Sequence, residues 1–318
     1  MKKNIFVAGH NGMVGSAIKK KLDVKNNVIT AEKSDLDLLN LENVKKFFKE
    51  NRIDEVYLAA AKVGGIYAND TNPVDFIFNN MVIQNNVIHS AFEANIRKLL
   101  FLGSSCIYPK FASQPISEEC LLTGKLEKTN EPYAIAKISG IKLCESINKQ
   151  YGYDYRSVMP TNLYGPRDNF HDTNSHVIPA LIRRFHEAKI KKYNSVEIWG
   201  SGNPKREFLH VDDMAEASIH VMEIDKDIFY SEVSEMESHI NIGSGIDHSI
   251  REIASIIKEI INYDGAIIFD KTKPDGTPRK LLNVQKINDL GWKSKISLLE
   301  GLTDTYDWFC KNQNSIRT

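Results

Sequence analysis

A short apolar run followed by regularly spaced glycines constrains the fold of this chain more than any other feature. Asn4–Ala8 has the composition of a buried strand, and Ser16–Leu22 has a helical pattern. Between them stand Gly9, Gly12 and Gly15. Glycines permit a tight turn and close backbone approach, while a helix N-terminus offers free amides and partial positive charge to a pyrophosphate. The pattern therefore predicts a dinucleotide-binding turn at the start of a parallel α/β sheet.

Further apolar segments alternate with helical patterns after this turn. The expected strands are residues 27–30, 55–59, 99–102 and 155–159, and the expected helices include 42–51, 74–95 and a run that begins at residue 131. Residues 99–102 are all apolar, as a central parallel strand buried on both faces should be. This alternation predicts an α/β fold with a doubly wound parallel sheet of the Rossmann type.

The regular alternation ends near residue 166, and we predict a domain boundary there. Residues 1–165 should form the NADP-binding Rossmann domain, and residues 166–318 should mainly form a smaller α/β substrate domain. We assign the expected strand His239–Ile242 to the smaller domain. The segment 206–222 is expected to pack back on the first domain.

Tyr133 and Lys137 predict acid–base chemistry. Four residues apart on a helix, they share one face, so a phenol and an ammonium can serve one site. A phenol has a reference pKa of ~10, and a nearby cation favours its ionised form. The spacing alone is common on solvated helix faces. It gains weight from the glycine turn and from Ser104, which follows the central strand.

Composition points to a small-molecule partner. Lys+Arg and Asp+Glu balance at 41 each, which argues against general nucleic-acid or membrane-surface binding. No apolar run approaches the ~20 residues that span a bilayer, so we expect a cytoplasmic protein. The four cysteines are scattered without metal-ligand spacing, so we expect free thiols and no metal site.

The residues after the second expected strand bear on the choice of cofactor. In such folds an acidic side chain there favours NAD, and a basic one favours NADP. Glu32 and Lys33 are adjacent, and either could face the ribose. We expect NADP(H) on the strength of Lys33, with NAD(H) as the weaker alternative.

Several motifs across the chain carry a family resemblance. They are Ala59–Gly65, Gly103–Lys110, Thr129–Lys137, Asn174–Pro179, Arg206–Met214 and Lys273–Lys280. With the glycine turn, they resemble the GDP-L-fucose synthase family of the extended short-chain dehydrogenase/reductase superfamily. The resemblance implies epimerisation of GDP-4-keto-6-deoxy-D-mannose at C3 and C5, followed by NADPH-dependent reduction at C4.

The resemblance also implies roles for individual residues. Tyr133 would protonate the C4 oxygen, Ser104 would hydrogen-bond to that oxygen, and Lys137 would lower the tyrosine pKa. The C4 carbonyl acidifies the hydrogens on both neighbouring carbons. Cys106 is therefore expected to act as the base and His176 as the acid of the epimerisation.

The resemblance assigns binding residues as well. Those expected at the cofactor are Gly9, His10, Asn11, Gly12, Met13, Val14, Gly15, Lys33, Ala60, Leu102, Gly103, Tyr133, Lys137, Pro160, Asn162, Leu163 and His176. Those expected at the GDP-sugar are Ser105, Asn162, Val177, Arg184, Trp199, Arg206 and Lys280. The family further suggests a homodimer that pairs the helices at 74–95 and 133–147.

Three positions depart from the family pattern and leave alternatives open. Asn11 and Lys33 stand where arginines usually contact the NADP 2′-phosphate, and Tyr67 replaces a smaller residue. The main alternative is a C4-reductase without epimerase action, on a GDP-4-keto-6-deoxy-heptose or a related sugar. A remote alternative is a non-catalytic cofactor-sensing protein, although its expected signature is loss of Tyr133 or Lys137.

Overall fold

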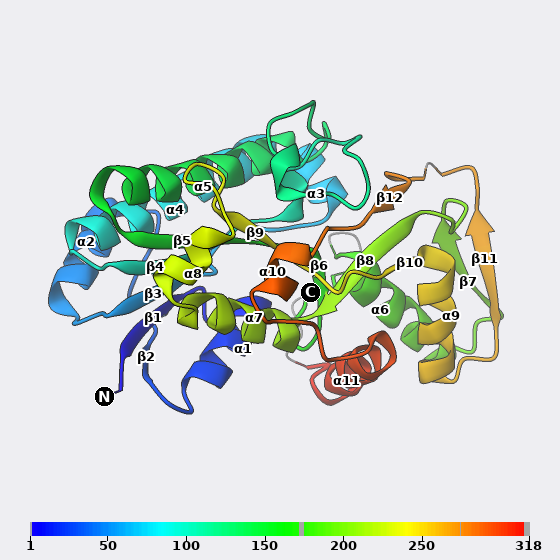
Figure 1. Ribbon diagram of the computed structural model, residues 1–318. Coiled ribbons are helices and arrows are strands. Elements are labelled where there is room, and N and C mark those ends of the chain that lie inside the picture. The colour runs from blue at the N-terminus through cyan, green and yellow to red at the C-terminus, as the bar shows by residue number, and fades with distance from the viewer. Residues whose placement is uncertain (1, 172–174, 274, 315–318) are drawn as a thin grey trace.

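A six-stranded parallel sheet forms the centre of the computed structural model, which describes residues 2–171, 175–273 and 275–314 (Figure 1). Its order is β2-β1-β3-β4-β5-β9. The strands are β1 Asn4–Ala8, β2 Asn27–Ile29, β3 Glu55–Leu58, β4 Lys98–Leu102, β5 Asp154–Pro160 and β9 His239–Ile242. The order reverses between β1 and β3, and ligands of such sheets bind beyond the carboxyl ends of the strands at this point.

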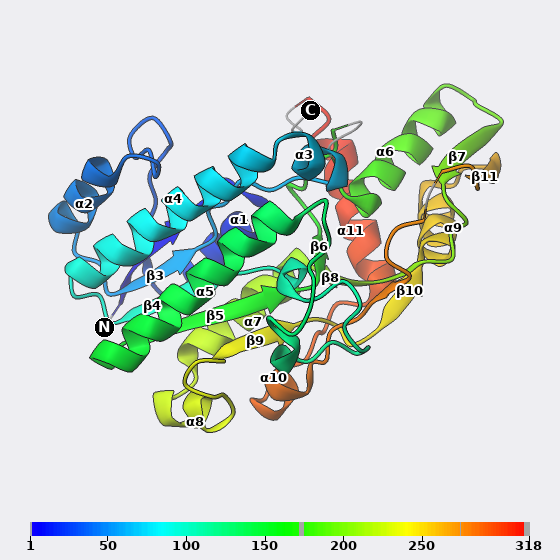
Figure 2. The same ribbon diagram turned by 90° about the horizontal axis from the view of Figure 1, so that it is seen from above.

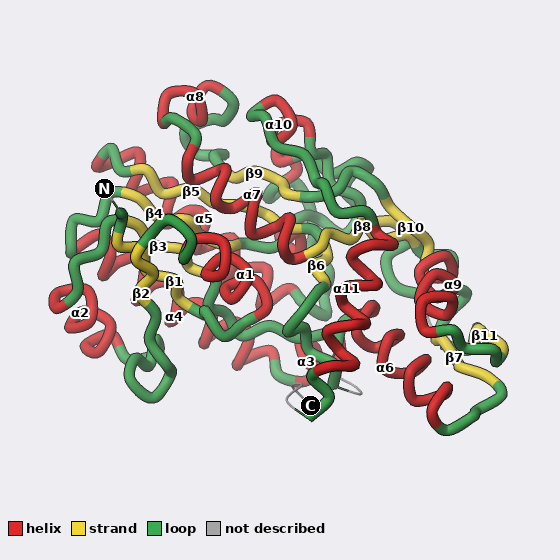
Figure 3. Tube along the Cα trace, turned by 90° about the horizontal axis from the view of Figure 1, so that it is seen from below, coloured by secondary structure: helices red, strands yellow, loops and turns green. Residues whose placement is uncertain are grey.

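Helices cover both faces of the sheet, which confirms the predicted doubly wound fold. On one face lie α2 Leu41–Glu50, α4 Pro73–Glu93 and α5 Glu131–Tyr151, with α4 and α5 side by side (Figure 2). On the other face α1 Met13–Leu22 packs against α7 Val211–Glu223 (Figure 3). Separate apolar clusters fill the two layers, one around Phe6 and Val44 and the other around Ile18 and Met214. No helix among the described residues is long and apolar enough to cross a membrane.

The sixth strand corrects one sequence-based prediction. We predicted that His239–Ile242 belongs to the smaller domain, but β9 pairs with β5, and Val158 lies opposite Ile240. All four residues of β9 are buried. A short buried strand carries no local signal of its partner, and α7, which lies on this sheet, brings the chain back to its edge.

The remaining elements form a smaller α/β layer beside the carboxyl ends of the sheet. Its strands are β6 Asn162–Tyr164, β7 Ser195–Trp199, β8 Lys205–His210, β10 Asp247–Ser249, β11 Ala266–Asp270 and β12 Arg279–Lys280. Its longer helices are α6 Val177–Ile190, α9 Ile250–Ile261 and α11 Leu298–Lys311. The shorter helices of the chain are α3 Ile66–Thr71, α8 Lys226–Ser231 and α10 Gln285–Asp289, with single 3₁₀ turns at Ser105–Ile107 and Glu118–Cys120.

A buried carboxylate joins the strands of this layer. Glu207 on β8 is fully buried and accepts hydrogen bonds from the backbone amides of Gly245 at 2.7 Å and Leu282 at 2.9 Å. Burial raises the pKa of this carboxyl group. The contacts fix β12, which carries Lys280, beside β8, which carries Arg206.

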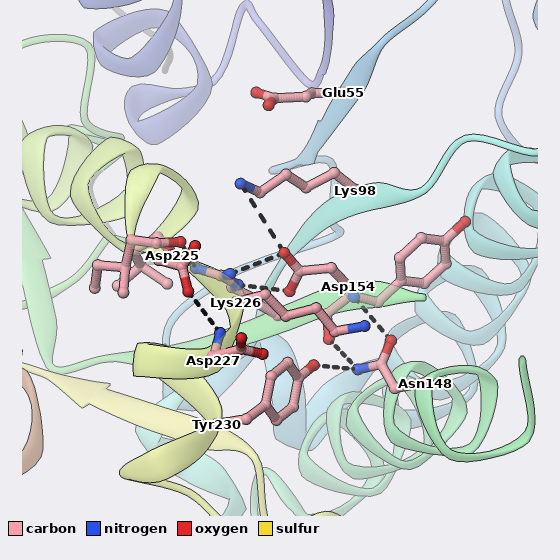
Figure 4. A network of polar contacts seen from close by, with 12 residues as sticks. Glu55, Lys98, Asn148, Asp154, Asp225, Lys226, Asp227 and Tyr230 are labelled. Atoms are coloured by element: carbon pink, nitrogen blue, oxygen red, sulfur yellow. Dashed lines mark hydrogen bonds and ion pairs between the residues drawn. The ribbon is translucent and has the colours of Figure 1, made fainter. Parts of the chain in front are cut away.

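A buried ion pair fastens the opposite end of the sheet (Figure 4). The guanidinium of Arg156 is fully buried and donates to both carboxylate oxygens of Asp154, at 2.7 and 2.8 Å. It also donates to the carbonyl of Ile224 at 2.9 Å and lies 4.4 Å from the centre of the Phe229 ring. These contacts tie β5 to the chain that leads from α7 into α8.

We predict that Asp154→Ala lowers the free energy of unfolding by about 3 kcal/mol, because it leaves Arg156 buried without its counter-ion. Equilibrium denaturation in urea measures the change. Glu235→Ala is the matched control, since it breaks the exposed pair of Lys149 and Glu235 and should cost less than about 0.5 kcal/mol. Equal effects of the two variants would contradict a structural role for the buried pair.

Candidate active site

The glycine turn is tight and lies against the loop after β3. Gly9 has a φ of 87°, and its carbonyl accepts a hydrogen bond from the Gly12 amide at 2.9 Å. A Cβ on Gly9 would lie 2.7 Å from the backbone nitrogen of Ala60. A Cβ on Gly15 would lie 2.2 Å from the Gly9 carbonyl oxygen. The N-cap of α1, Gly12, has no side chain that could cap the helix, so amides of its first turn can bind a phosphate.

The structure distinguishes Glu32 from Lys33, which the sequence could not. The side-chain Nδ2 of Asn11 donates to Glu32 Oε2 at 2.8 Å, and Nε2 of His10 lies 3.2 Å from Glu32 Oε1. Glu32 therefore contacts the glycine turn, although both Glu32 and Lys33 are exposed to solvent. Glu32 is absent from the predicted cofactor contacts. An acidic residue after the second strand is the sequence signal that could have placed Glu32 at the cofactor.

Lys137 joins α5 to the end of β4. Its Nζ donates to the carbonyl of Leu102 at 2.8 Å and lies 4.8 Å from the centre of the Phe101 ring. The side chain is 3% exposed, and burial lowers the pKa of Lys137 to about 7. The same ammonium lies 5.9 Å from the ring centre of Tyr133.

Tyr133 is held as a protonated phenol. Burial and the neighbouring Cys106 thiol raise its pKa, and a hydrogen bond with Ser104 opposes this shift. Burial dominates the shift of the Tyr133 pKa, and our prediction that Lys137 lowers this pKa stays a prediction. A protonated phenol suits the donation of a proton to a carbonyl oxygen.

Ser104 and Cys106 follow β4 on one 3₁₀ turn. The hydroxyl of Ser104 accepts a hydrogen bond from the Cys106 amide at 3.2 Å. Nζ of Lys280 lies 3.7 Å from Sγ of Cys106. We predicted Lys280 as a ligand of the GDP phosphates, whereas in the structure its ammonium contacts the thiol. A cation at this distance can stabilise the negative charge of a thiolate.

His176 begins helix α6, away from this cluster in the sequence. Its carbonyl accepts a hydrogen bond from the Ala180 amide at 3.1 Å. The residue is exposed to solvent, and partial loss of water around the imidazole lowers the pKa of His176. No contact within the described residues joins His176 to Cys106, so its part in the same reaction stays a prediction. Asn174, from the motif that precedes it, lies outside the described residues.

An exposed tryptophan stands at the end of β7. Trp199 is 62% exposed, and its ring centre lies 5.9 Å from the guanidinium of Arg184 and 5.5 Å from Nζ of Lys273. An exposed aromatic ring near two cations suits a nucleotide base and its phosphates. We predicted Trp199 and Arg184 but not Lys273, although Lys273 opens one of the motifs quoted above. Pro274, the next residue, lies outside the described part of the chain.

The other predicted residues lie around these groups or at strand ends. The side chain of Asn162 donates to the Glu207 carbonyl at 2.8 Å, and Arg206 is half-buried and donates to the Lys205 carbonyl at 2.7 Å. Ser105 is 4% exposed, while Val177 is 38% exposed. Met13 and Val14 lie at the start of α1, and Gly103 directly follows β4. Pro160 ends β5, and Leu163 lies within β6.

We predict that Lys137→Met changes the pH dependence of stability. Between pH 7 and 10 the unfolded lysine, with its pKa of ~10.4, binds a proton that the folded lysine lacks, so this residue makes the wild type more stable as pH rises. Raising the pH from 6.5 to 10 should therefore make the variant less stable relative to the wild type. The difference in melting temperature, variant minus wild type, should become more negative by at least about 3 °C. Lys46→Met, at an exposed position on α2, is the control, and a constant difference for Lys137→Met would contradict the prediction.

The chain matches known proteins over nearly its whole length. Residues 5–243 match the NAD dependent epimerase/dehydratase family. The sequence is 59% identical over 318 residues to the GDP-L-fucose synthase of Escherichia coli (strain K12), with 99% of each chain covered.

Two solved structures from Campylobacter jejuni are similar in fold. One is a GDP-6-OMe-4-keto-L-xylo-heptose reductase, with a TM-score of 0.92, 39% identity and 98% of each chain covered. The other is a GDP-mannoheptose C4 reductase with NADP bound, with a TM-score of 0.87, 40% identity, and 97% of this chain and 98% of that chain covered.

Proposed function

The chain belongs to the NAD dependent epimerase/dehydratase family, and from this premise we propose that it converts GDP-4-keto-6-deoxy-D-mannose to GDP-L-fucose. The enzyme inverts C3 and C5 of the sugar and reduces the C4 ketone with NADPH. The full-length 59% identity to a GDP-L-fucose synthase carries this conclusion. In the structure, a protonated Tyr133 and a thiol beside an ammonium lie in one cluster, which is the chemistry that the two steps need.

For the reduction we assign the proton to Tyr133. NADPH, when bound, supplies the hydride to C4. Residues that fit it are the glycine turn, with its available α1 amides, and Lys137 beside the end of β4. The Tyr133 phenol donates its proton to the C4 oxygen, and Ser104 hydrogen-bonds to that oxygen. Partial burial raises the pKa of the phenol and keeps it protonated until the oxygen becomes basic.

For the epimerisation we assign the base to Cys106. The C4 ketone acidifies the hydrogens at C3 and C5, so a thiolate can remove each one to give an enolate. His176 then returns a proton on the opposite face. Lys280, at 3.7 Å from Sγ, stabilises the thiolate that starts the step. The lowered pKa of the His176 imidazole makes its protonated form a stronger acid.

The proposal extends to substrate binding and assembly. Trp199 stacks on guanine, and Arg184, Arg206 and Lys273 meet the diphosphate. The enzyme is a cytoplasmic homodimer that buries the paired α4 and α5. The exposed Phe78, 61% accessible on α4, gives that surface an apolar contact.

A second candidate is a C4-reductase without epimerase action on a GDP-4-keto-6-deoxy-heptose. The TM-score of 0.92 to a heptose reductase favours this alternative, although the identity of 39% is lower than that to the fucose synthase. The two functions differ in proton chemistry at C3 and C5. Exchange of those hydrogens with solvent therefore separates them.

We predict that Tyr133→Phe and Cys106→Ser separate the two steps. Tyr133→Phe should reduce NADPH oxidation by ~10²-fold or more because the C4 oxygen loses its proton donor, while Cys106→Ser should reduce hydrogen exchange by a similar factor. Each variant should retain the other activity. NADPH absorbance and ¹H NMR of GDP-4-keto-6-deoxy-D-mannose in D₂O measure the two steps. Normal reduction by Tyr133→Phe would refute its role, and wild-type reduction without exchange would identify a C4-reductase.

We predict that Lys280→Met slows exchange at C3 and C5 by about tenfold at pH 7, because the Cys106 thiolate loses the cation beside it. NADPH binding should be unchanged. Lys271→Met, at an exposed position after β11, is the control. A raised KM with an unchanged exchange rate at saturating substrate would instead make Lys280 a phosphate ligand.

A further inference from the structure

The contact between the glycine turn and Glu32 bears on which cofactors this enzyme accepts. The Glu32 side chain is 59% exposed, yet two neighbours hold its carboxylate. Asn11 donates to Oε2 at 2.8 Å, and the His10 ring, 11% exposed, lies 3.2 Å from Oε1. Both neighbours belong to the turn that would bind the pyrophosphate. The negative charge is therefore fixed beside the turn.

This position is where such folds read the adenosine ribose. A carboxylate after the second strand accepts hydrogen bonds from ribose hydroxyls. The same carboxylate repels a 2′-phosphate, which carries a charge of about −2 at neutral pH. Lys33 next to it supplies one exposed cation, so the two formal charges cancel. A single lysine also lacks the paired donors with which arginine grips a phosphate.

We propose that Glu32 is a specificity-determining residue that weakens discrimination in favour of NADPH, so that the enzyme also accepts NADH. Its carboxylate bonds to the 2′-hydroxyl of NADH and opposes the 2′-phosphate of NADPH. Asn11 and His10 act as positioning residues, because they hold that carboxylate in place. The inference rests on the proposed dinucleotide site at the glycine turn.

Binding of two non-reacting probes tests this inference without catalysis. Isothermal titration calorimetry with 2′-phospho-ADP-ribose and ADP-ribose gives the ratio of their Kd values. The wild type should bind the two probes within about tenfold of each other. Glu32→Gln should shift the ratio at least about fivefold towards 2′-phospho-ADP-ribose, because a like charge a few ångströms from the phosphate is removed.

Asp35→Asn provides the matched control. Asp35 is exposed three residues further along, and its side chain accepts a hydrogen bond from Ser34 at 3.3 Å. This change removes the same charge but should alter the ratio less than twofold. An unchanged ratio in Glu32→Gln, or an equal shift in Asp35→Asn, would overturn the role of Glu32. Failure of the wild type to bind either probe would instead refute the dinucleotide site itself.

Discussion

The hydrogen bond from Lys137 to the Leu102 carbonyl joins helix α5 to the end of a central strand. Because α5 is fixed at this point, Tyr133 stands one turn away over the residues that follow β4. Ser104 bonds to the phenol, and Cys106 is close enough to influence it. The contact also buries an ammonium whose pKa falls to about 7, a cost in stability that the apolar layers around it offset. The reactive groups thus depend on the packing of one helix against one strand.

Much of the architecture could be predicted because local patterns encode it. The strands β1, β3, β4 and β5 follow from apolar runs in the sequence. The turn at Gly9, where φ is positive, follows from the spacing of the glycines. Partnerships between distant segments could not be predicted. β9 joins β5 through backbone hydrogen bonds that leave no trace in its composition, and Lys280 reaches Cys106 from 174 residues away along the chain.

The pKa shifts and side-chain orientations at the site were harder to predict than the residues that form it. Spacing correctly placed Tyr133 near Lys137, but it carried no information on burial, which raises the pKa of the phenol and lowers that of the ammonium. Burial penalises the phenolate and the ammonium alike. The orientation of Glu32 could not be predicted either, because Glu32 and Lys33 are adjacent and the sequence does not show which of them faces the cofactor. Only the contacts with Asn11 and His10 resolve it.

Two kinds of proton chemistry meet in this cluster, and the account depends on their acting on one sugar. Cys106, with Lys280, is assigned to the carbons beside the ketone, while Tyr133 and Ser104 are assigned to its oxygen. The most direct measurement is a single turnover of wild-type enzyme with GDP-4-keto-6-deoxy-D-mannose and NADPH in D₂O, with the product analysed by NMR. The account predicts GDP-L-fucose with deuterium at C3 and C5 and protium at C4. A reduced sugar that keeps its original hydrogens and configuration at C3 and C5 would contradict it.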